Sequence, residues 1–425
     1  MECVVYIAAI ISIFAYISIT AAASDSFLMT ILFHANRFPY PPFRGDKLKI
    51  YNLCLRLSKV HELHLITFLE DESDIQYLPE LRKIFKEIHL VPLPKGRAIY
   101  NTFKTLFNGL PLQVGYFHMQ SMQKKIDTLC KAYHYDAVHI QHIRLAPYWQ
   151  HRSDMPRILD LPDAFSLYWE RRANNSKGFK KFFERFEYKR LLKYEKVLNN
   201  FQLSLVCSKE DLNYLKEKQG IRNIAILPNG VDTQTFKLNP HDYTINNTLL
   251  FTGNMDYAPN VDAVLYFVED ILPIIKKACP DVQFIIAGQR PVPKVQALHN
   301  EQENVQVTGF IPNIADMYTT ATVVVAPLRI GAGTQNKVLE AMAMGVPVVS
   351  RNIGFEGLDV DNGEGVYLKM TAHEFAEQCI ILLQNETERM RCGNAGQSVI
   401  KNRYAWEKVA AQLDAYFEEI TSYKA

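Results

Sequence analysis

Short apolar, β-branched runs alternate with longer segments of helical spacing along most of this chain. The clearest unit lies at residues 323–350. Within it, apolar runs at 323–326 and 346–349 have the length of strands, and residues 335–344 between them are good helix formers. A strand, a short loop, a helix and a second strand in this order make up one unit of a parallel α/β sheet.

The loop of this unit has the composition of an anion site. Gly331 and Gly333 allow backbone N–H groups to approach a ligand closely. Thr334 is the predicted N-cap of the helix that follows, and a helix N-terminus favours negative charge. Arg329 and Lys337 add positive charge at the same place.

Polar side chains continue along the helix. Asn336 and Glu340 are four residues apart, so they share one helix face, with Lys337 beside them. A carboxylate one turn or more beyond a phosphate site suits the two hydroxyls of a ribose. We therefore predict a nucleotide site; the alternative is an ordinary βαβ unit whose glycines only make a tight turn.

The pattern extends on both sides of this unit. Further strands are predicted at 30–34, 64–68, 87–91, 137–141, 157–161, 203–208, 224–227, 248–251, 283–287 and 305–308, and helices at 79–85, 122–132 and 177–201. A polar stretch at 229–247 contains Pro240 and has the character of a linker. With 425 residues, the chain is long enough for two α/β domains of ordinary size.

Three more positions follow predicted strands. Gly45 lies at a helix start, and Gly253 with Asn254 lies at a strand end, so both places offer backbone N–H groups to an oxygen ligand. His142 follows the strand at 137–141, at the edge of an open parallel sheet where ligands bind. A lone His is more often structural than functional.

The string LEAMAMGVPVV at 339–349 resembles the signature of the family 4 glycosyltransferases, which are retaining enzymes of the GT-B fold. The longer string QNKVLEAMAM at 335–344 is similar to the subgroup of bacterial sugar transferases associated with exopolysaccharide and exosortase loci. This resemblance covers about Met29 to the C-terminus. It implies two Rossmann-like α/β domains that face a cleft.

The resemblance also implies the domain boundaries. It predicts an acceptor-binding domain at 29–235, a nucleotide-sugar domain at 236–402, and a last helix at 403–425 that packs back on the first domain. Residues 1–28 precede this fold. Residues 4–23 are nearly all apolar and long enough to span a bilayer, so this segment is an anchor, a signal peptide, or an extension before a start at Met29, which we favour.

The implied reaction moves a hexose from a UDP- or GDP-sugar to a glycan or lipid-linked acceptor in cell-surface polysaccharide synthesis. The departing phosphate takes the acceptor proton, and neither a cofactor nor a metal is expected. The implied catalytic residues are Glu340, Lys337, Arg329 and His142, although Gln141 is an alternative to His142. The implied donor contacts are Gly331, Gly333, Thr334, Asn336, Glu340, Gly253, Asn254 and Gly45.

The sequence departs from the family pattern at two places. The family has a first Glu eight positions before Glu340, where this chain has Ala332. Many members have an Arg and a Lys that clamp the diphosphate, but no Arg or Lys occurs at 248–275. We expect Arg329 and Lys337 to replace that clamp.

The composition of the chain narrows the possible partners and cellular compartments. The net charge of +2 does not suggest nucleic acid as a partner. The 7 cysteines contain no C-x-x-C pair, which indicates a reducing compartment and argues against a zinc site. We expect a cytoplasmic protein, with the inner face of the cell membrane as a further option. A non-catalytic partner subunit, an exported binding protein and a sugar-nucleotide epimerase are the other functions that fit.

The predicted helix at 177–201 suggests how a membrane contact would arise. Phe179, Phe182, Phe183 and Phe186 fall on one face, and the Lys and Arg residues of the helix outnumber its Glu residues. Such a helix lies on an anionic membrane, or it turns the phenylalanines to the core and the cations to solvent. We favour the core-facing arrangement.

Overall fold

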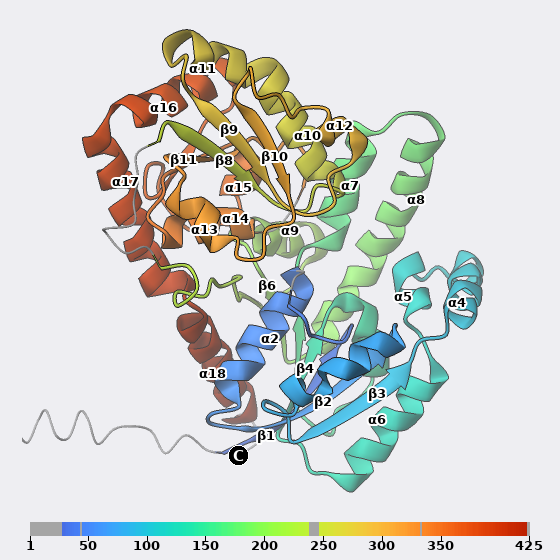
Figure 1. Cartoon of the computed structure of the whole chain (residues 1–425). Coiled ribbons are helices and arrows are strands. Elements are labelled where there is room, and N and C mark those ends of the chain that lie inside the picture. Colours follow the sequence, from blue (N-terminus) through green and yellow to red (C-terminus); the bar gives the residue numbers. More distant parts are fainter. Residues whose placement is uncertain (1–27, 43–44, 238–245, 332–333, 423–425) are drawn as a thin grey trace, which may run out of the picture.

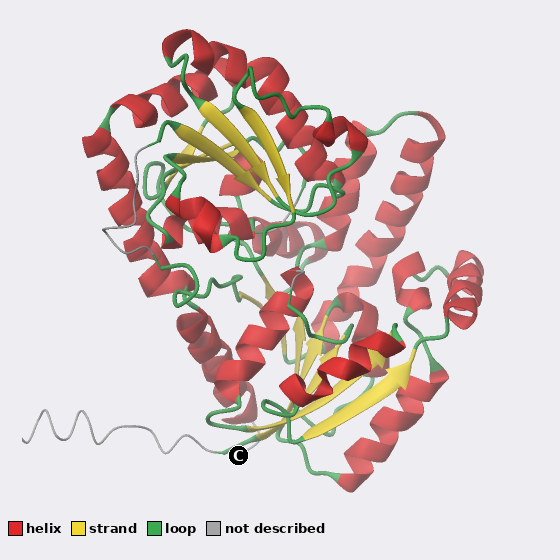
Figure 2. Cartoon of the chain, in the orientation of Figure 1, coloured by secondary structure: helices red, strands yellow, loops and turns green. Residues whose placement is uncertain are grey.

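A computed structural model describes residues 28–42, 45–237, 246–331 and 334–422. The chain forms two α/β domains, each built on its own parallel sheet with helices on both faces (Figures 1 and 2). The predicted fold class is therefore confirmed.

The N-terminal sheet has seven parallel strands in the order β3-β2-β1-β4-β5-β6-β7. Their bounds are β1 (Thr30–Ala35), β2 (Glu62–Leu69), β3 (Glu87–Pro92), β4 (Ala137–Gln141), β5 (Arg157–Asp160), β6 (Leu203–Val206) and β7 (Ile224–Ile226). The strand order reverses between β1 and β4. In open parallel sheets, ligands bind in the crevice at the carboxyl ends of such a pair.

The helices of this domain follow the strands in turn. They are α2 (Gly45–Leu57), η1 (Glu72–Tyr77), α3 (Leu78–Leu81), α4 (Lys95–Asn108), α5 (Leu112–Tyr116), α6 (Gln120–Ala132), η2 (Ile143–Tyr148), α7 (Phe165–Asn175), α8 (Gly178–Tyr194), η3 (Glu195–Asn200) and α9 (Lys209–Gln219).

The C-terminal sheet has six parallel strands in the order β10-β9-β8-β11-β12-β13, and its order reverses between β8 and β11. The strands are β8 (Thr248–Thr252), β9 (Gln283–Ala287), β10 (Val305–Gly309), β11 (Val323–Ala326), β12 (Val348–Ser350) and β13 (Val366–Leu368). The helices are α10 (Ala258–Tyr266), η4 (Phe267–Ile271), α11 (Leu272–Ala278), α12 (Pro293–Gln296), α13 (Ala315–Thr319), α14 (Asn336–Ala343), α15 (Asn352–Phe355), α16 (Ala372–Gln384), α17 (Glu386–Val399), η5 (Ile400–Tyr404) and α18 (Trp406–Ser422).

Each sheet separates two apolar clusters, because neighbouring residues of a strand point to opposite faces. In β1, Leu32 belongs to one cluster and Phe33 to the other. The helix α18 is the last helix of the chain, yet its apolar face joins the cluster around Phe33. Phe417 of α18 meets Phe33 edge to face, with ring centroids 6.2 Å apart. The C-terminal helix thus packs on the N-terminal domain (Figure 1).

Two segments cross between the domains, and they pair with each other. Val231 lies after β7 and forms an isolated parallel bridge with Ala405, which precedes α18. The backbone N–H of Val231 donates to the carbonyl of Tyr404 at 2.8 Å. Next to this pair, Gly230 lies against the buried ring of Trp406, where a Cβ atom would come within 2.5 Å of the ring.

Two helix predictions need correction. The helix expected at 177–201 is split into α8 and η3, and the helix expected at 79–85 ends at Leu81. The phenylalanine stripe does not face the core: Phe179 is 83% exposed and Phe182 is 70% exposed. The buried face of α8 is polar instead, because Glu184 and Glu187 find partners on neighbouring segments.

The close contact at Gly230 predicts a stability effect. Gly230→Ala adds a Cβ atom that the Trp406 ring must move away from, and overpacking of this kind costs about 1–3 kcal/mol. We expect a lower midpoint in thermal unfolding followed by circular dichroism. Gly96→Ala is the control, since no atom lies within 4 Å of its added Cβ. An unchanged midpoint for Gly230→Ala would show that the two crossing segments do not need this contact.

Candidate functional site

The carboxyl ends of β8 and β9 approach each other through two glycines. The N–H of Gly253 donates to the carbonyl of Ala287 at 3.0 Å. Gly288 has a φ of 151°, and a Cβ atom there would come within 1.7 Å of the Gly253 carbonyl oxygen. Only glycine fits at Gly288, because the loops after β8 and β9 approach each other closely beside the switch point between β8 and β11.

Glu340 lies on α14, directly behind this edge, and is held in place by a chain of hydroxyls. The hydroxyl of Tyr318 on α13 donates to Glu340 Oε2 at 2.7 Å, and Thr252 Oγ1 at the end of β8 lies 2.9 Å from the same hydroxyl. Burial raises the pKa of Glu340, against the lowering effects of Tyr318 and Lys337. The other carboxylate oxygen, Oε1, makes no hydrogen bond to a described residue.

Lys337 lies one turn before Glu340 and is almost fully buried. Its Nζ donates to Asn260 Oδ1 of α10 at 2.8 Å and lies 3.9 Å from the centre of the Phe251 ring. Burial lowers the pKa of Lys337 to about 7, and the nearby Glu340 carboxylate opposes that shift. A lysine at this pKa is ready to take up a proton when an anion arrives.

Arg329 differs from what we expected. Its guanidinium binds both carboxylate oxygens of Asp262 on α10, with Nε 2.9 Å from Oδ2, and it lies over the Tyr266 ring at 4.4 Å. The charge of Arg329 is therefore already paired, and the structure does not direct it to the same ligand as Lys337. Its role in a diphosphate clamp stays a prediction.

The loop before α14 is described only in part. Ala332 and Gly333 lie outside the described residues. Gly331 has a φ of 146°. We predicted Thr334 as the N-cap of α14, and this prediction is wrong. The helix begins one residue later, with Gln335 as its N-cap. The Thr334 hydroxyl donates to the carbonyl of Gly357 at 3.2 Å instead.

Two asparagines link the segments around this loop. The first residue of α14, Asn336, accepts a hydrogen bond from Asn229 of the interdomain crossing at 3.4 Å. Asn254 accepts one from Gln289 at 2.9 Å, so the loops after β8 and β9 are tied together. Both asparagines thus serve the framework of the site in this structure.

In the N-terminal domain, His142 follows β4 at the switch point with β1. It adopts a φ of 87°, which is rare outside glycine and often marks functional sites. Its Nδ1 accepts the N–H of Arg144 at 3.3 Å. Burial lowers the pKa of His142 far below its usual range, and the charges of Arg144 and Arg37 lower it further, so the imidazole is neutral.

Gly45 begins α2 at the same edge of this sheet. No atom lies within 4 Å of a Cβ built on it, so the structure does not require glycine at this position. The next residue, Asp46, accepts a hydrogen bond from Gln141 through its carbonyl at 2.6 Å. Gln141, the alternative to His142, is therefore engaged in holding the helix start.

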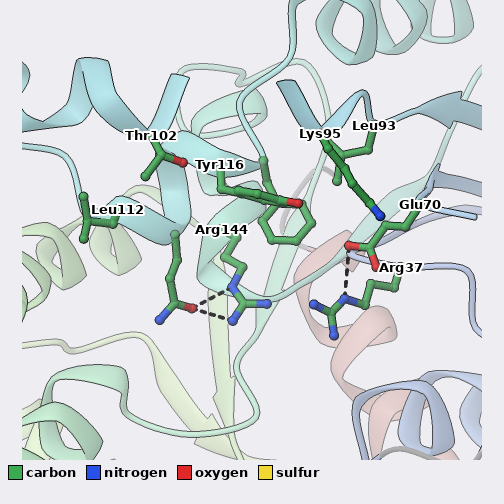
Figure 3. A pocket seen from close by; sticks show the side chains of 10 residues that line it. Arg37, Glu70, Leu93, Lys95, Thr102, Leu112, Tyr116 and Arg144 are labelled. Carbon is green, nitrogen blue, oxygen red and sulfur yellow. Dashed lines mark hydrogen bonds and ion pairs between the residues drawn. The ribbon is translucent and has the colours of Figure 1, made fainter. Parts of the chain in front are cut away.

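A cavity of about 470 Å³ opens beside these residues (Figure 3). Its lining comes from the ends of β1 to β4 and from α4 and α5, and it comprises Arg37, Glu70, Leu93, Lys95, Thr102, Leu112, Gln113, Tyr116, Phe117 and Arg144. Three cations face one carboxylate in this set. Gln113 orients the Arg144 guanidinium at 2.9 Å, and Glu70 pairs with Arg37 at 3.3 Å.

Arg171 on α7 connects the two domains beside the loop that precedes α14. Its guanidinium binds Glu210 of its own domain and lies 3.0 Å from Glu356 of the other. It also reaches the carbonyl of Gly331 at 3.5 Å. Burial and the neighbouring Glu356 raise the pKa of Glu210 to about 8.

Sequence reasoning missed the residues that support the predicted ones. Tyr318, Asn260 and Arg171 reach the site from helices that are distant in the sequence, and no local motif marks them. In the described part of the chain, no group of His, Cys, Asp and Glu side chains is arranged to hold a metal ion. None of the described helices combines the length and the apolar composition needed to cross a bilayer.

Comparison with known proteins finds a family match over part of the C-terminal domain. Residues 246–385 match the family described as glycosyl transferases group 1. The chain is 24% identical over 387 residues to an uncharacterized 44.6 kDa protein in the cps region of Klebsiella pneumoniae, covering 88% of this chain and 96% of that one.

Among solved structures, HepE of Anabaena in complex with UDP superposes with a TM-score of 0.67 at 15% identity, over 92% of this chain and 100% of HepE. Sucrose-phosphate synthase from Thermosynechococcus elongatus gives a TM-score of 0.64 at 16% identity, over 93% of this chain and 100% of that one. At these identities the likeness shows the fold. The C-terminal domain thus carries the sequence pattern of the group 1 glycosyltransferases, and the two domains together have the GT-B fold.

Proposed function

We propose that this protein is a retaining glycosyltransferase of family 4 that moves a hexose from a nucleotide-diphosphate sugar to a glycan or lipid-linked acceptor. The observation that carries the proposal is the tethered Glu340 behind the glycine-lined edge of the C-terminal sheet. HepE, of the same fold, has been crystallised with UDP and with UDP-glucose, which supports a nucleotide-sugar donor. The acceptor belongs to cell-surface polysaccharide synthesis in this proposal.

The donor lies across the switch point of the C-terminal sheet. Glu340 accepts hydrogen bonds from the ribose hydroxyls through the oxygen that Tyr318 leaves available. Lys337 and the backbone N–H groups near Gly253 and Gly331 face the diphosphate. Because these groups neutralise the departing diphosphate, the proposal invokes neither a divalent metal nor another cofactor.

The acceptor lies in the cavity of the N-terminal domain. Arg37 and Arg144 give the cavity positive charge, and Tyr116 and Phe117 give it flat apolar surface on which a sugar ring packs. His142 is neutral and lies close to both arginines, so it offers a hydrogen bond to the reacting sugar rather than a charge.

Transfer is concerted on one face of the sugar. The bond between the anomeric carbon and the diphosphate oxygen breaks, and the bond to the acceptor oxygen forms on the same side. The acceptor proton passes to the departing diphosphate oxygen, so no separate protein base is needed. The protein contributes position and charge stabilisation. Nucleotide sugars are cytoplasmic, so we place the enzyme in the cytoplasm.

Two observations favour a second candidate, a non-catalytic partner subunit of GT-B fold. The family's first Glu is replaced by Ala332, and Arg329 is paired with Asp262 instead of facing the predicted diphosphate position. Turnover of a nucleotide sugar by the purified chain decides between the two candidates.

We expect Glu340→Gln to weaken donor binding about tenfold or more, because a hydrogen bond to a charged group contributes about 1.5–3 kcal/mol. The amide keeps the size of the side chain, so the fold is preserved. Isothermal titration with UDP- and GDP-hexoses measures the effect, with the exposed Glu301→Gln as the matched control. Equal donor affinities of the wild type and Glu340→Gln would show that Glu340 does not bind the ribose.

Donor affinity should also depend on pH through Lys337. The diphosphate of a nucleotide sugar keeps its full charge near neutral pH, and it favours the protonated lysine. With a pKa of about 7 in the free protein, Lys337 is charged below pH 7, so affinity is constant there. Above pH 7 binding must take up a proton, and affinity falls by up to tenfold per pH unit.

Titrations between pH 6 and 9 in two buffers of different ionisation enthalpy measure both the affinity and the proton uptake. Lys337→Met removes the titrating group, so its weaker affinity should not change with pH. A wild-type affinity that is flat from pH 6 to 9 would show that Lys337 does not contact the diphosphate.

A further inference from the structure

The helix α4 is packed with its large apolar side chains outward. Its buried residues are the small Ala98 and Thr105, whereas Ile99, Phe103 and Phe107 are 59%, 65% and 89% exposed. An ordinary surface helix turns its apolar stripe to the core and its polar face to water. Packing within the described chain therefore does not cover the apolar face of α4, and this face is free to contact another molecule.

The neighbouring helix α8 has the same inverted arrangement. Its phenylalanines lie on the outer side, from 37% exposed at Phe186 to 83% exposed at Phe179. Its buried face holds Glu184 and Glu187. Glu184 pairs with Arg172 of α7 at 2.8 Å, and Glu187 accepts the N–H of Leu112 at 2.8 Å. These polar contacts orient α8 with its phenylalanines on the outer side of the helix.

The two helices form one continuous surface. Arg190 of α8 donates to the carbonyl of Thr105 in α4, and Glu187 of α8 holds the start of α5, which follows α4. Both helices lie on the same side of the molecule (Figure 1). We call this the α4–α8 surface; its exposed apolar members are Ile99, Tyr100, Phe103, Leu106, Phe107, Phe179, Phe182, Phe183 and Phe186.

The charge of this surface has a single sign. The helix α4 contains no Asp or Glu, and both carboxylates of α8 are buried. The exposed charged side chains of the two helices are Lys95, Arg97, Lys104, Lys180, Arg185, Lys189 and Lys193. The whole chain has a net charge of only +2, so this surface concentrates its positive charge.

We propose that the α4–α8 surface docks on an anionic lipid bilayer. Phenylalanines enter the boundary between headgroups and acyl chains, and lysines and arginines remain at the level of the anionic headgroups. A second copy of this chain would present the same positive charge and be repelled, and an acidic soluble protein would not offer an apolar layer for the phenylalanines.

Docking would also place the acceptor cavity near the lipid headgroups, because Lys95 and Thr102 of α4 form part of its lining. This consequence rests on the proposed function and favours a lipid-linked, anionic acceptor. Docking itself does not depend on transfer activity, so a chain without turnover can still bind membranes.

The sharpest test places a fluorescent reporter on the surface itself. Phe103→Trp and Phe310→Trp replace phenylalanines that are both 65% exposed, one on α4 and one in the C-terminal domain, in the full chain. The native Trp149, Trp169 and Trp406 are buried and give both variants the same background. The probe is vesicles of phosphatidylglycerol and phosphatidylcholine containing brominated lipid.

We expect a blue shift and quenching for Phe103→Trp only. Equal quenching in the two variants, or no quenching of Phe103→Trp, would overturn the proposal. The reporter senses lipid contact at position 103 itself, so binding through the apolar segment at 4–23 would not imitate the expected result. A dimer in lipid-free solution that becomes a monomer in Phe103→Ser would overturn it too, because a second copy would then be the occupant.

Charge reversal gives an independent prediction. Lys104→Glu combined with Lys180→Glu should lower the affinity for phosphatidylglycerol vesicles, measured by co-sedimentation, about tenfold or more. Each cation near an anionic surface contributes a factor of about five to this affinity. Lys294→Glu combined with Lys401→Glu makes the same change of charge on exposed lysines of the other domain and should have little effect. An equal loss of vesicle binding in both double variants would show that only the net charge of the protein matters. It would contradict docking through the α4–α8 surface.

Discussion

The pairing of the two crossing segments is the constraint on which the relation between the domains depends. Val231 and Ala405 lie side by side, and the Trp406 ring fills the space that Gly230 leaves. Because α18 then packs on the first sheet, the chain is anchored to its N-terminal domain at both ends of the C-terminal one. This arrangement brings Asn229 to the first residue of α14, so the linker borders the predicted nucleotide site.

The polar groups of the site are held from outside their own motif. Glu340 depends on Tyr318, and Lys337 depends on Asn260, so the helix that bears both side chains is locked to α13 and α10. Fixed polar groups of this kind need no rearrangement when charge develops on a leaving group. In the N-terminal domain, Gln113 plays the same part for Arg144 and keeps its guanidinium at the cavity.

Buried polar pairs also explain why α8 turns a polar face to the interior. An unpaired carboxylate in the interior is costly, but Glu187 meets a backbone N–H and Glu184 meets Arg172, so both are accommodated. The phenylalanines of α8 then lie on its outer side, from 37% exposed at Phe186 to 83% exposed at Phe179. Helical spacing predicted that they share one face, yet periodicity does not say whether that face points to the core or to solvent, and we assigned it to the core wrongly.

The sequence by itself determined the parallel α/β class, most strands within one or two residues, and the segment that carries Glu340 and Lys337, because apolar periodicity and glycine positions are local properties. It misplaced the N-cap at Thr334, which turns away to bond Gly357. Only the tertiary structure decided the partners: Asp262 for Arg329, Tyr318 for Glu340, Arg171 across the domains, and the cavity at the ends of four strands. Those contacts join residues far apart in the chain, and no spacing rule encodes which distant side chain will satisfy a buried charge.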